Sequence, residues 1–224
     1  MSTRRTTTLT SAASTYDMVP LAIVKDELQI PDTSYDTRLG RWITQCSRAI
    51  MRYCNRTFAV EALTDAFWPD RDPYTYQVPG GTPDLQLARF PILNAATASP
   101  PIPAPVIVEN SLTLTEGSDY IVDYEKGLIQ RLGNYGYAIV WPAWNVTVAY
   151  SAGYLAIPDD VQDACIRLVK GRYYAEQRDP LLRSEDIAGV AKFEYWIDTG
   201  KGRNGNMPPD VLDLLDNYRD IRLV

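Results

Sequence analysis

The sequence predicts an α+β protein: a small helical bundle, an inserted antiparallel β module, and a C-terminal arm carrying a short helix. Three observations support this fold class. Apolar residues follow a helical period over residues 36–54 and again after Pro158. Between these segments the helical period disappears, and short β-rich runs alternate with Pro and Gly. A Gly-rich stretch over residues 198–206 then precedes one more short apolar helix.

These patterns divide the chain into five parts. We expect the N-terminal part to be flexible, because its first residues are rich in Ser and Thr. In order, the parts are a flexible segment (1–19), a helical bundle (20–57 with 156–182), an inserted β module (58–155), a strand-like arm with a Gly-rich linker (183–206), and a C-terminal docking helix (207–224).

Pro20 suits the first turn of a short helix over residues 20–29, and Pro31 ends it. The next helix follows from apolar residues spaced three or one apart, which occupy one face. These residues are Leu39, Trp42, Ile43, Cys46, Ala49, Ile50, Tyr53 and Cys54.

Five arginines share the opposite flank of this second helix, within an arc of about 80° at 100° per residue. They are Arg38, Arg41, Arg48, Arg52 and Arg56. Two interpretations stay open at this point. The arginines form a solvated face, or they form a ridge that meets an acidic neighbouring subunit or nucleic acid.

The β module contains short runs that we expect to be strands, namely residues 85–87, 106–108, 112–114, 120–122, 128–129, 138–140 and 146–150. Its aromatic residues either pack in the core and loops or stack on sugars or a partner. They are Phe67, Trp68, Tyr74, Tyr76, Tyr135, Tyr137, Trp141 and Trp144.

The third long helix begins with Pro158 and two acids and ends at Asp179-Pro180. Its expected apolar face comprises Val161, Ala164, Cys165, Leu168, Arg172 and Ala175. Residues 186–197 are expected to form a strand or an extended arm.

The last helix begins at Pro208-Pro209-Asp210. Its apolar residues, which we expect to dock onto a partner, are Val211, Leu214, Leu215, Tyr218 and Ile221, beside an acidic row of Asp213, Asp216 and Asp220.

The composition argues against an enzyme. The chain has no His, which removes the usual general base and metal ligand. The net charge is 22 − 28 = −6, a poor basis for gripping DNA through its phosphates. We expect no cofactor, no metal and no membrane helix.

The three cysteines, Cys46, Cys54 and Cys165, are expected to be buried, reduced thiols. Acid/base or cation chemistry is left to Asp70-Arg71-Asp72 and Asp159-Asp160, although neighbouring acids are common in loops and at helix starts.

Four pieces of the chain carry a resemblance, by their order and spacing. The first is residues 24–30 with the helix ending at residues 51–58, and the second is residues 87–92 followed by 117–123 and 127–132. The third is residues 146–154 with the helix that follows, and the fourth is residues 184–189. Together they span about residues 20–197, and in this order the chain resembles the head-tail connector (adaptor, head completion) proteins of long-tailed phages.

The resemblance implies a structural protein of the virion neck, present in the host cytoplasm during assembly. It implies a homo-oligomeric ring, usually of twelve copies, below the portal protein. Such a ring extends the channel through which double-stranded DNA passes and attaches the tail or a stopper protein. It also implies that residues 207–224 reach the portal. Two alternative functions stay open: a host- or carbohydrate-binding virion module built on the aromatic residues, and a carboxylate-dependent hydrolase.

Overall fold

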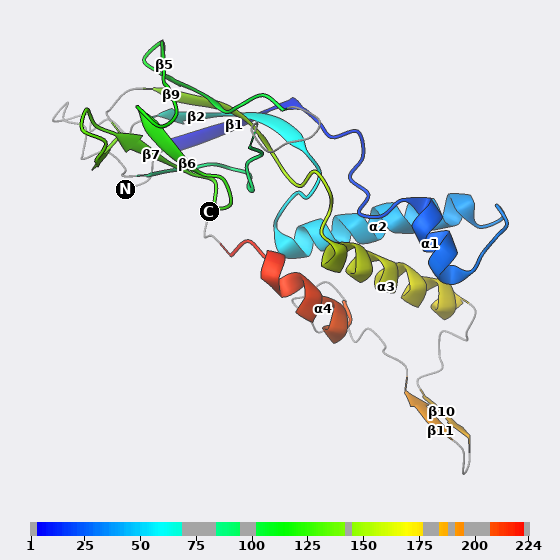
Figure 1. Cartoon of the computed structure of the whole chain (residues 1–224). Coiled ribbons are helices and arrows are strands. Elements are labelled where there is room, and N and C mark those ends of the chain that lie inside the picture. The colour runs from blue at the N-terminus through cyan, green and yellow to red at the C-terminus, as the bar shows by residue number, and fades with distance from the viewer. Residues whose placement is uncertain are drawn as a thin grey trace. The chain divides into compact units, whose positions relative to one another are not determined.

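The computed structural model describes residues 4–68, 84–94, 102–141, 145–176, 184–187, 191–194 and 207–221. The chain divides into two compact units. The β unit comprises Met1–Ser14 and Ala59–Leu155, and the helical unit comprises Thr15–Phe58 and Ala156–Val224. Figure 1 shows all the long helices in one unit and strands β1 to β9 in the other. The predicted α+β class, with antiparallel sheets, is confirmed.

The helical unit contains α1 (Leu21–Leu28), α2 (Asp36–Cys54), α3 (Asp159–Glu176) and α4 (Pro209–Leu215), which continues into the short 3-10 helix η1 (Asp216–Tyr218). Each predicted helix is present, and α2 has the predicted bounds. Left-handed residues at Gln29 and Asn55 end α1 and α2. The predicted end of α3 at Asp179-Pro180 lies outside the described residues.

The expected arm contains a two-stranded antiparallel hairpin of β10 (Ser184–Ile187) and β11 (Ala191–Glu194). None of the helices in the described part of the chain combines the length and the apolar composition needed to cross a membrane.

The core of the helical unit contains most of the predicted residues. On α2, Leu39, Ile43, Cys46, Ile50 and Cys54 are buried as predicted, and Ser47 is buried with them. On α3 the burial is shifted from the prediction. Val161, Ala164 and Cys165 are buried, but the fourth buried residue is Val169, and Arg172 and Ala175 are exposed. The prediction for Arg172 and Ala175 is therefore wrong, because the last turns of α3 extend beyond the core.

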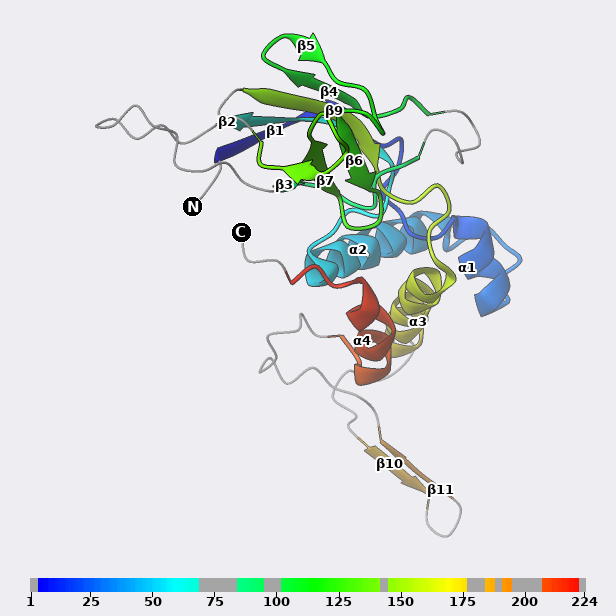
Figure 2. The same ribbon diagram turned by 60° about the vertical axis from the view of Figure 1, so that its left-hand side comes forward.

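The β unit is built from two antiparallel sheets. The first has the order β1-β2-β9-β4-β5, and the second has the order β3-β7-β6, with β8 paired to β7 (Figure 2). The bounds are β1 Arg4–Ser11, β2 Glu61–Trp68, β3 Asp84–Gln86, β4 Val106–Glu109, β5 Leu112–Thr113, β6 Tyr120–Asp123, β7 Leu128–Leu132, β8 Ala138–Ile139 and β9 Val146–Ala152.

Part of the N-terminal segment expected to be flexible forms a strand. Arg4–Ser11 forms an edge strand that pairs with β2, from Arg4 opposite Trp68 to Leu9 opposite Leu63. Its run of threonines suits a strand, because β-branched side chains pack well on a pleated surface. β2 itself was not predicted. Its alternation is masked because two of its inward-facing residues, Glu61 and Asp65, are acidic.

The turn after β9 depends on one glycine. Gly153 has φ +125°, and a Cβ atom there would lie 2.4 Å from the carbonyl oxygen of Ala59. Its N–H donates to the carbonyl of Pro91 over 2.9 Å. Three segments of the β unit therefore meet at a point that has room only for backbone.

Candidate assembly surface

The rotation of α2 about its axis is fixed by its buried face. Besides its apolar residues, this face carries Ser47, whose Oγ accepts the backbone N–H of Met18 over 2.9 Å and lies 3.7 Å from Cys165 Sγ. A helix held in this way on one side presents its other side to solvent. The arginines predicted for that side are found there: Arg38, Arg41, Arg48 and Arg52 are exposed, and Arg56 is half-buried.

The five arginines differ in their pairing. Arg38 binds both carboxylate oxygens of Glu176 through Nη1, each at 2.8 Å, so its charge is compensated. Arg56 is not free either, and it lies just beyond the C-terminal end of α2. Within the described part of the chain, Arg41, Arg48 and Arg52 have no hydrogen bond or ion pair. They line up along about 16 Å of helix axis at 1.5 Å per residue.

A fourth guanidinium extends this row from the neighbouring helix. Arg172 of α3 donates from Nη1 to Oε1 of Gln45 over 2.7 Å, and Gln45 lies between Arg41 and Arg48 on the same side of α2. Sequence reasoning missed Arg172 because it placed this residue on the apolar face of α3. We call Arg41, Arg48, Arg52 and Arg172 the basic ridge.

The segment of α2 that carries Arg41, Arg48 and Arg52 contains no acid. Residues 37–60 contain five arginines and neither Asp nor Glu. Like charges spaced three or four residues apart on a helix repel one another. An anionic partner would therefore bind the ridge favourably. Its affinity would be higher at low salt, because salt screens charges.

The C-terminal helix packs inside the helical unit. Val211 and Leu215 are both fully buried, and Leu214 and Tyr218 are half-buried. The Tyr218 ring packs edge-on against Phe58, with 6.0 Å between ring centroids. Tyr53 donates to a carboxylate oxygen of Asp216, and the N–H of Asp220 donates to the carbonyl of Cys54 over 2.8 Å.

Of the five residues predicted to dock onto a portal protein, two are buried within their own unit. Val211 and Leu215 cannot contact a portal protein while they fill the core of their own unit. Ile221, the last of the predicted docking residues, is 79% exposed. A short helix is marginal alone in water, and here its partner surface lies within the same chain.

An acidic surface lies where α3 begins and α4 packs against it. Arg167 of α3 pairs with Asp163 at 2.8 Å and with Asp210 of α4 at 3.1 Å. Tyr218 donates to Asp160 over 3.3 Å. We call Asp159, Asp160, Asp163, Asp210 and Asp213 the acidic patch. Asp159 and Asp213 are exposed and have no hydrogen bond or ion pair among the described residues.

The structure describes two of the candidate catalytic acids. Asp159 and Asp160 lie exposed in the first turn of α3, and Asp70-Arg71-Asp72 lies outside the described residues. Among the residues that the structure describes, no group of three or more Cys, Asp or Glu residues is placed to hold a metal ion.

All three cysteines are buried and free, as predicted. Burial raises the pKa of Cys54 and of Cys165 to about 12 and also raises the pKa of Cys46. Thiols of this kind stay protonated near neutral pH, so they are weak nucleophiles in the folded chain.

The aromatic residues of the β unit are divided between core and surface. Phe67 and Trp141 are buried, and the Trp141 ring N–H donates to the carbonyl of Ile129 over 3.2 Å. Tyr135 and Tyr137 are exposed, with stacked rings 6.3 Å apart. Trp68 is 48% exposed at the end of β2. Tyr74, Tyr76 and Trp144 lie outside the described residues.

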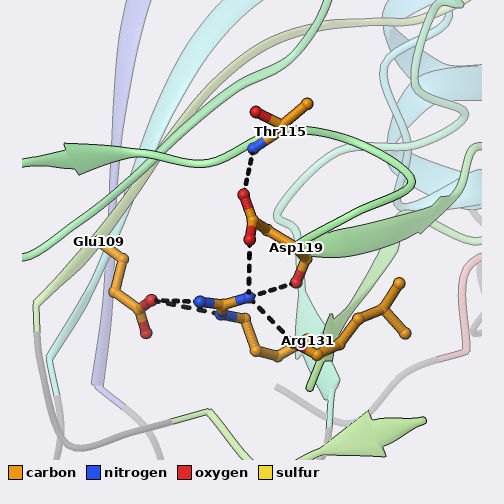
Figure 3. A network of polar contacts seen from close by, with 5 residues as sticks. Glu109, Thr115, Asp119 and Arg131 are labelled. Carbon is orange, nitrogen blue, oxygen red and sulfur yellow. Dashed lines mark hydrogen bonds and ion pairs between the residues drawn. The ribbon is translucent and has the colours of Figure 1, made fainter. Parts of the chain in front are cut away.

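Two polar networks hold the β unit together, and sequence reasoning found neither. In the first, the buried Asp65 carboxylate accepts from Tyr150 over 3.0 Å and from the N–H of Ala88 over 2.7 Å. In the second, Arg131 of β7 reaches Glu109 of β4 and so joins the two sheets (Figure 3). Arg131 also donates to the carbonyls of Asp119 and Leu132.

Comparison with known proteins gives a structural likeness alone. No family model matches the sequence, and no curated protein matches it. Eight chains of solved structures match, and the three described below align along almost the whole chain. Two are chains from the neck of a gene transfer agent particle. One neck was from an empty particle computed with C6 symmetry (TM-score 0.52, 16% identity), and the other was from a native particle computed with C12 symmetry (TM-score 0.51, 16% identity).

Each of these two alignments covers 98% of this chain and 97% of the other. The third match is a chain from the virion of a native gene transfer agent particle, with TM-score 0.52, 18% identity, and 97% of both chains covered. This chain shares their fold. At 16–18% identity, the likeness shows a shared fold and nothing beyond the fold.

Proposed function

We propose that this chain is a structural protein of a virion neck, a head-tail connector that assembles into a closed ring. One observation carries the proposal: the fold matches two chains from gene transfer agent necks and one from a gene transfer agent virion, over 97–98% of this chain and 97% of each of the others. The match covers both the β unit and the helical unit, so it does not rest on one common motif. The resemblance of the sequence to phage adaptors is an independent support.

In the proposed assembly the ring lies below the portal protein and extends the DNA channel toward the tail or a stopper protein. The ring would have twelve copies if it follows the C12 symmetry used for one of the neck structures. Double-stranded DNA would pass through the ring without sequence-specific recognition. A chain with net charge −6 suits such passage, because it does not hold the phosphate backbone tightly.

The experiment is to delete the gene for this chain from the particle that encodes it and to examine the particles by electron microscopy. We expect filled or leaking heads without tails, and tailed particles again once the chain is supplied in trans. Gold-labelled antibody against the chain should mark the junction of head and tail in complemented particles. Normal tailed particles after deletion would contradict the proposal.

A further inference from the structure

The charges of the helical unit are segregated between two surfaces. Residues 37–60, which include most of α2, have a charge of 5 − 0 = +5. The first five residues of α3 and residues 207–221 together carry seven Asp and one Arg, a charge of 1 − 7 = −6. The basic ridge and the acidic patch therefore carry net charges of opposite sign.

Among the described residues, neither surface is fully neutralised. On the basic ridge, Arg41, Arg48 and Arg52 have no acidic partner in the described residues, and Arg172 contacts the neutral Gln45. In the acidic patch, Arg167 is the cation that pairs with Asp163 and Asp210. Asp159 and Asp213 have neither an ion pair nor a hydrogen bond among the described residues. Both surfaces therefore keep charge that a partner can use.

The charged residues of both surfaces lie on the outer sides of their helices, opposite the buried residues. Asp213 lies midway between Val211 and Leu215, which are both fully buried, so Asp213 is on the outer side of α4. Arg48 and Arg52 flank the buried Ile50 and lie on the outer side of α2 in the same way. Figure 1 shows α2 and α4 as separate helices, each packed beside α3.

We propose that neighbouring copies meet head to tail, with the basic ridge of one copy against the acidic patch of the next. This inference rests on the proposed ring and names its contact. A closed ring needs two different, complementary surfaces on each subunit, and these surfaces are different and opposite in charge. A symmetric dimer that joined the two ridges or the two patches would instead bring like charges together. DNA is the less favoured partner of the ridge, because the acidic patch and the net charge both repel phosphates.

The test uses full-length protein and charge exchange. The ridge variant carries Arg48→Glu and Arg52→Glu, the patch variant carries Asp159→Lys and Asp213→Lys, and the exchange variant carries all four changes. Arg48→Lys with Arg52→Lys is the matched control that keeps the charge. Circular dichroism confirms folding, and sedimentation equilibrium at low salt measures self-association. A 30-base-pair duplex added to each protein measures DNA binding.

We expect wild type and the control to self-associate, and the association to weaken as salt is raised. The ridge and patch variants should each associate at least about tenfold more weakly, and the exchange variant should recover, because its two surfaces are again complementary. A 1:1 mixture of the ridge and patch variants should associate beyond the dimer, because copies of the two variants can alternate with complementary surfaces at every contact.

Unchanged association of the folded ridge variant would overturn the inference, as would wild type that stays monomeric. Loss of duplex binding in the ridge and exchange variants, with association unchanged, would assign the ridge to DNA instead. None of these results decides whether the chain lies in the neck, because labelling and deletion in particles measure that separately.

Discussion

Tyr150 of β9 donates its phenolic hydrogen to Oδ2 of Asp65 on β2 over 3.0 Å, and both residues are buried in the β unit. The Tyr150 oxygen in turn accepts the N–H of Arg89 over 3.2 Å, and Asp65 accepts the N–H of Ala88. These bonds tie the segment after β3 to the larger sheet. Two residues 85 positions apart thus complete one buried polar network.

We expect Tyr150→Phe to lower the free energy of unfolding by about 1.5–3 kcal/mol, the usual range for a hydrogen bond to a charged group. The change leaves the Asp65 carboxylate and the Arg89 N–H each short of a partner. Urea unfolding followed by circular dichroism measures the effect. Tyr135→Phe is the control, because Tyr135 is 89% exposed and should change stability by less than about 0.5 kcal/mol.

The Tyr150–Asp65 pair makes the free energy of unfolding depend on pH in the alkaline range. Burial, and then the nearby Asp65 charge, raises the pKa of Tyr150 above its usual value. Between the unfolded pKa of about 10 and the higher folded pKa, the unfolded chain loses this proton and the folded chain keeps it. The free energy of unfolding should therefore fall as pH rises above about 10. Tyr150→Phe should fall less steeply, and a slope identical to that of wild type would contradict this assignment.

Gly153→Ala should be strongly destabilising, by about 3 kcal/mol or more, because the added Cβ meets the Ala59 carbonyl at 2.4 Å and φ is +125°. Gly171→Ala is a matched control. Gly171 lies within α3, and a Cβ there would meet nothing within 4 Å. Alanine should raise helix stability at that position by about 0.5–1 kcal/mol. Thermal unfolding of both variants checks the prediction, which an equal shift in Tm for the two would refute.

Arg131→Met should destabilise the β unit by about 3 kcal/mol, because it leaves Glu109, which is 7% exposed, without its cation. Adding Glu109→Gln should recover most of that loss, since no buried charge is then uncompensated. A double-mutant cycle by urea unfolding gives the coupling between the two positions. Additive effects would mean that the ion pair in Figure 3 does not join the sheets energetically.

The parts of the fold that the sequence predicts are those with strong local periodicity. α2 follows from its apolar face, and short strands such as β6 and β9 follow from β-branched runs between turns. β1 was missed because a polar Thr-rich segment has the composition of a disordered tail. Its order comes from pairing with β2, a partner far along the chain. Local pattern carries no information about such a partner.

The candidate site was predictable on one helix and not across helices. The outward direction of Arg41, Arg48 and Arg52 follows from the position of the core on the other side of α2. The place of Arg172 in the basic ridge does not follow from the sequence, because it depends on how α3 packs beside Gln45. The burial of Val211 and Leu215 likewise depends on where α4 packs, which an amphipathic pattern leaves open.

The most direct measurement is a cryo-electron microscopy reconstruction of the neck in the particle that encodes this chain. The proposed function predicts a closed ring of copies between head and tail, centred on the DNA channel, whose density fits the helical unit and the β unit. Density for the chain at another location in the particle, or a neck without it, would contradict the account.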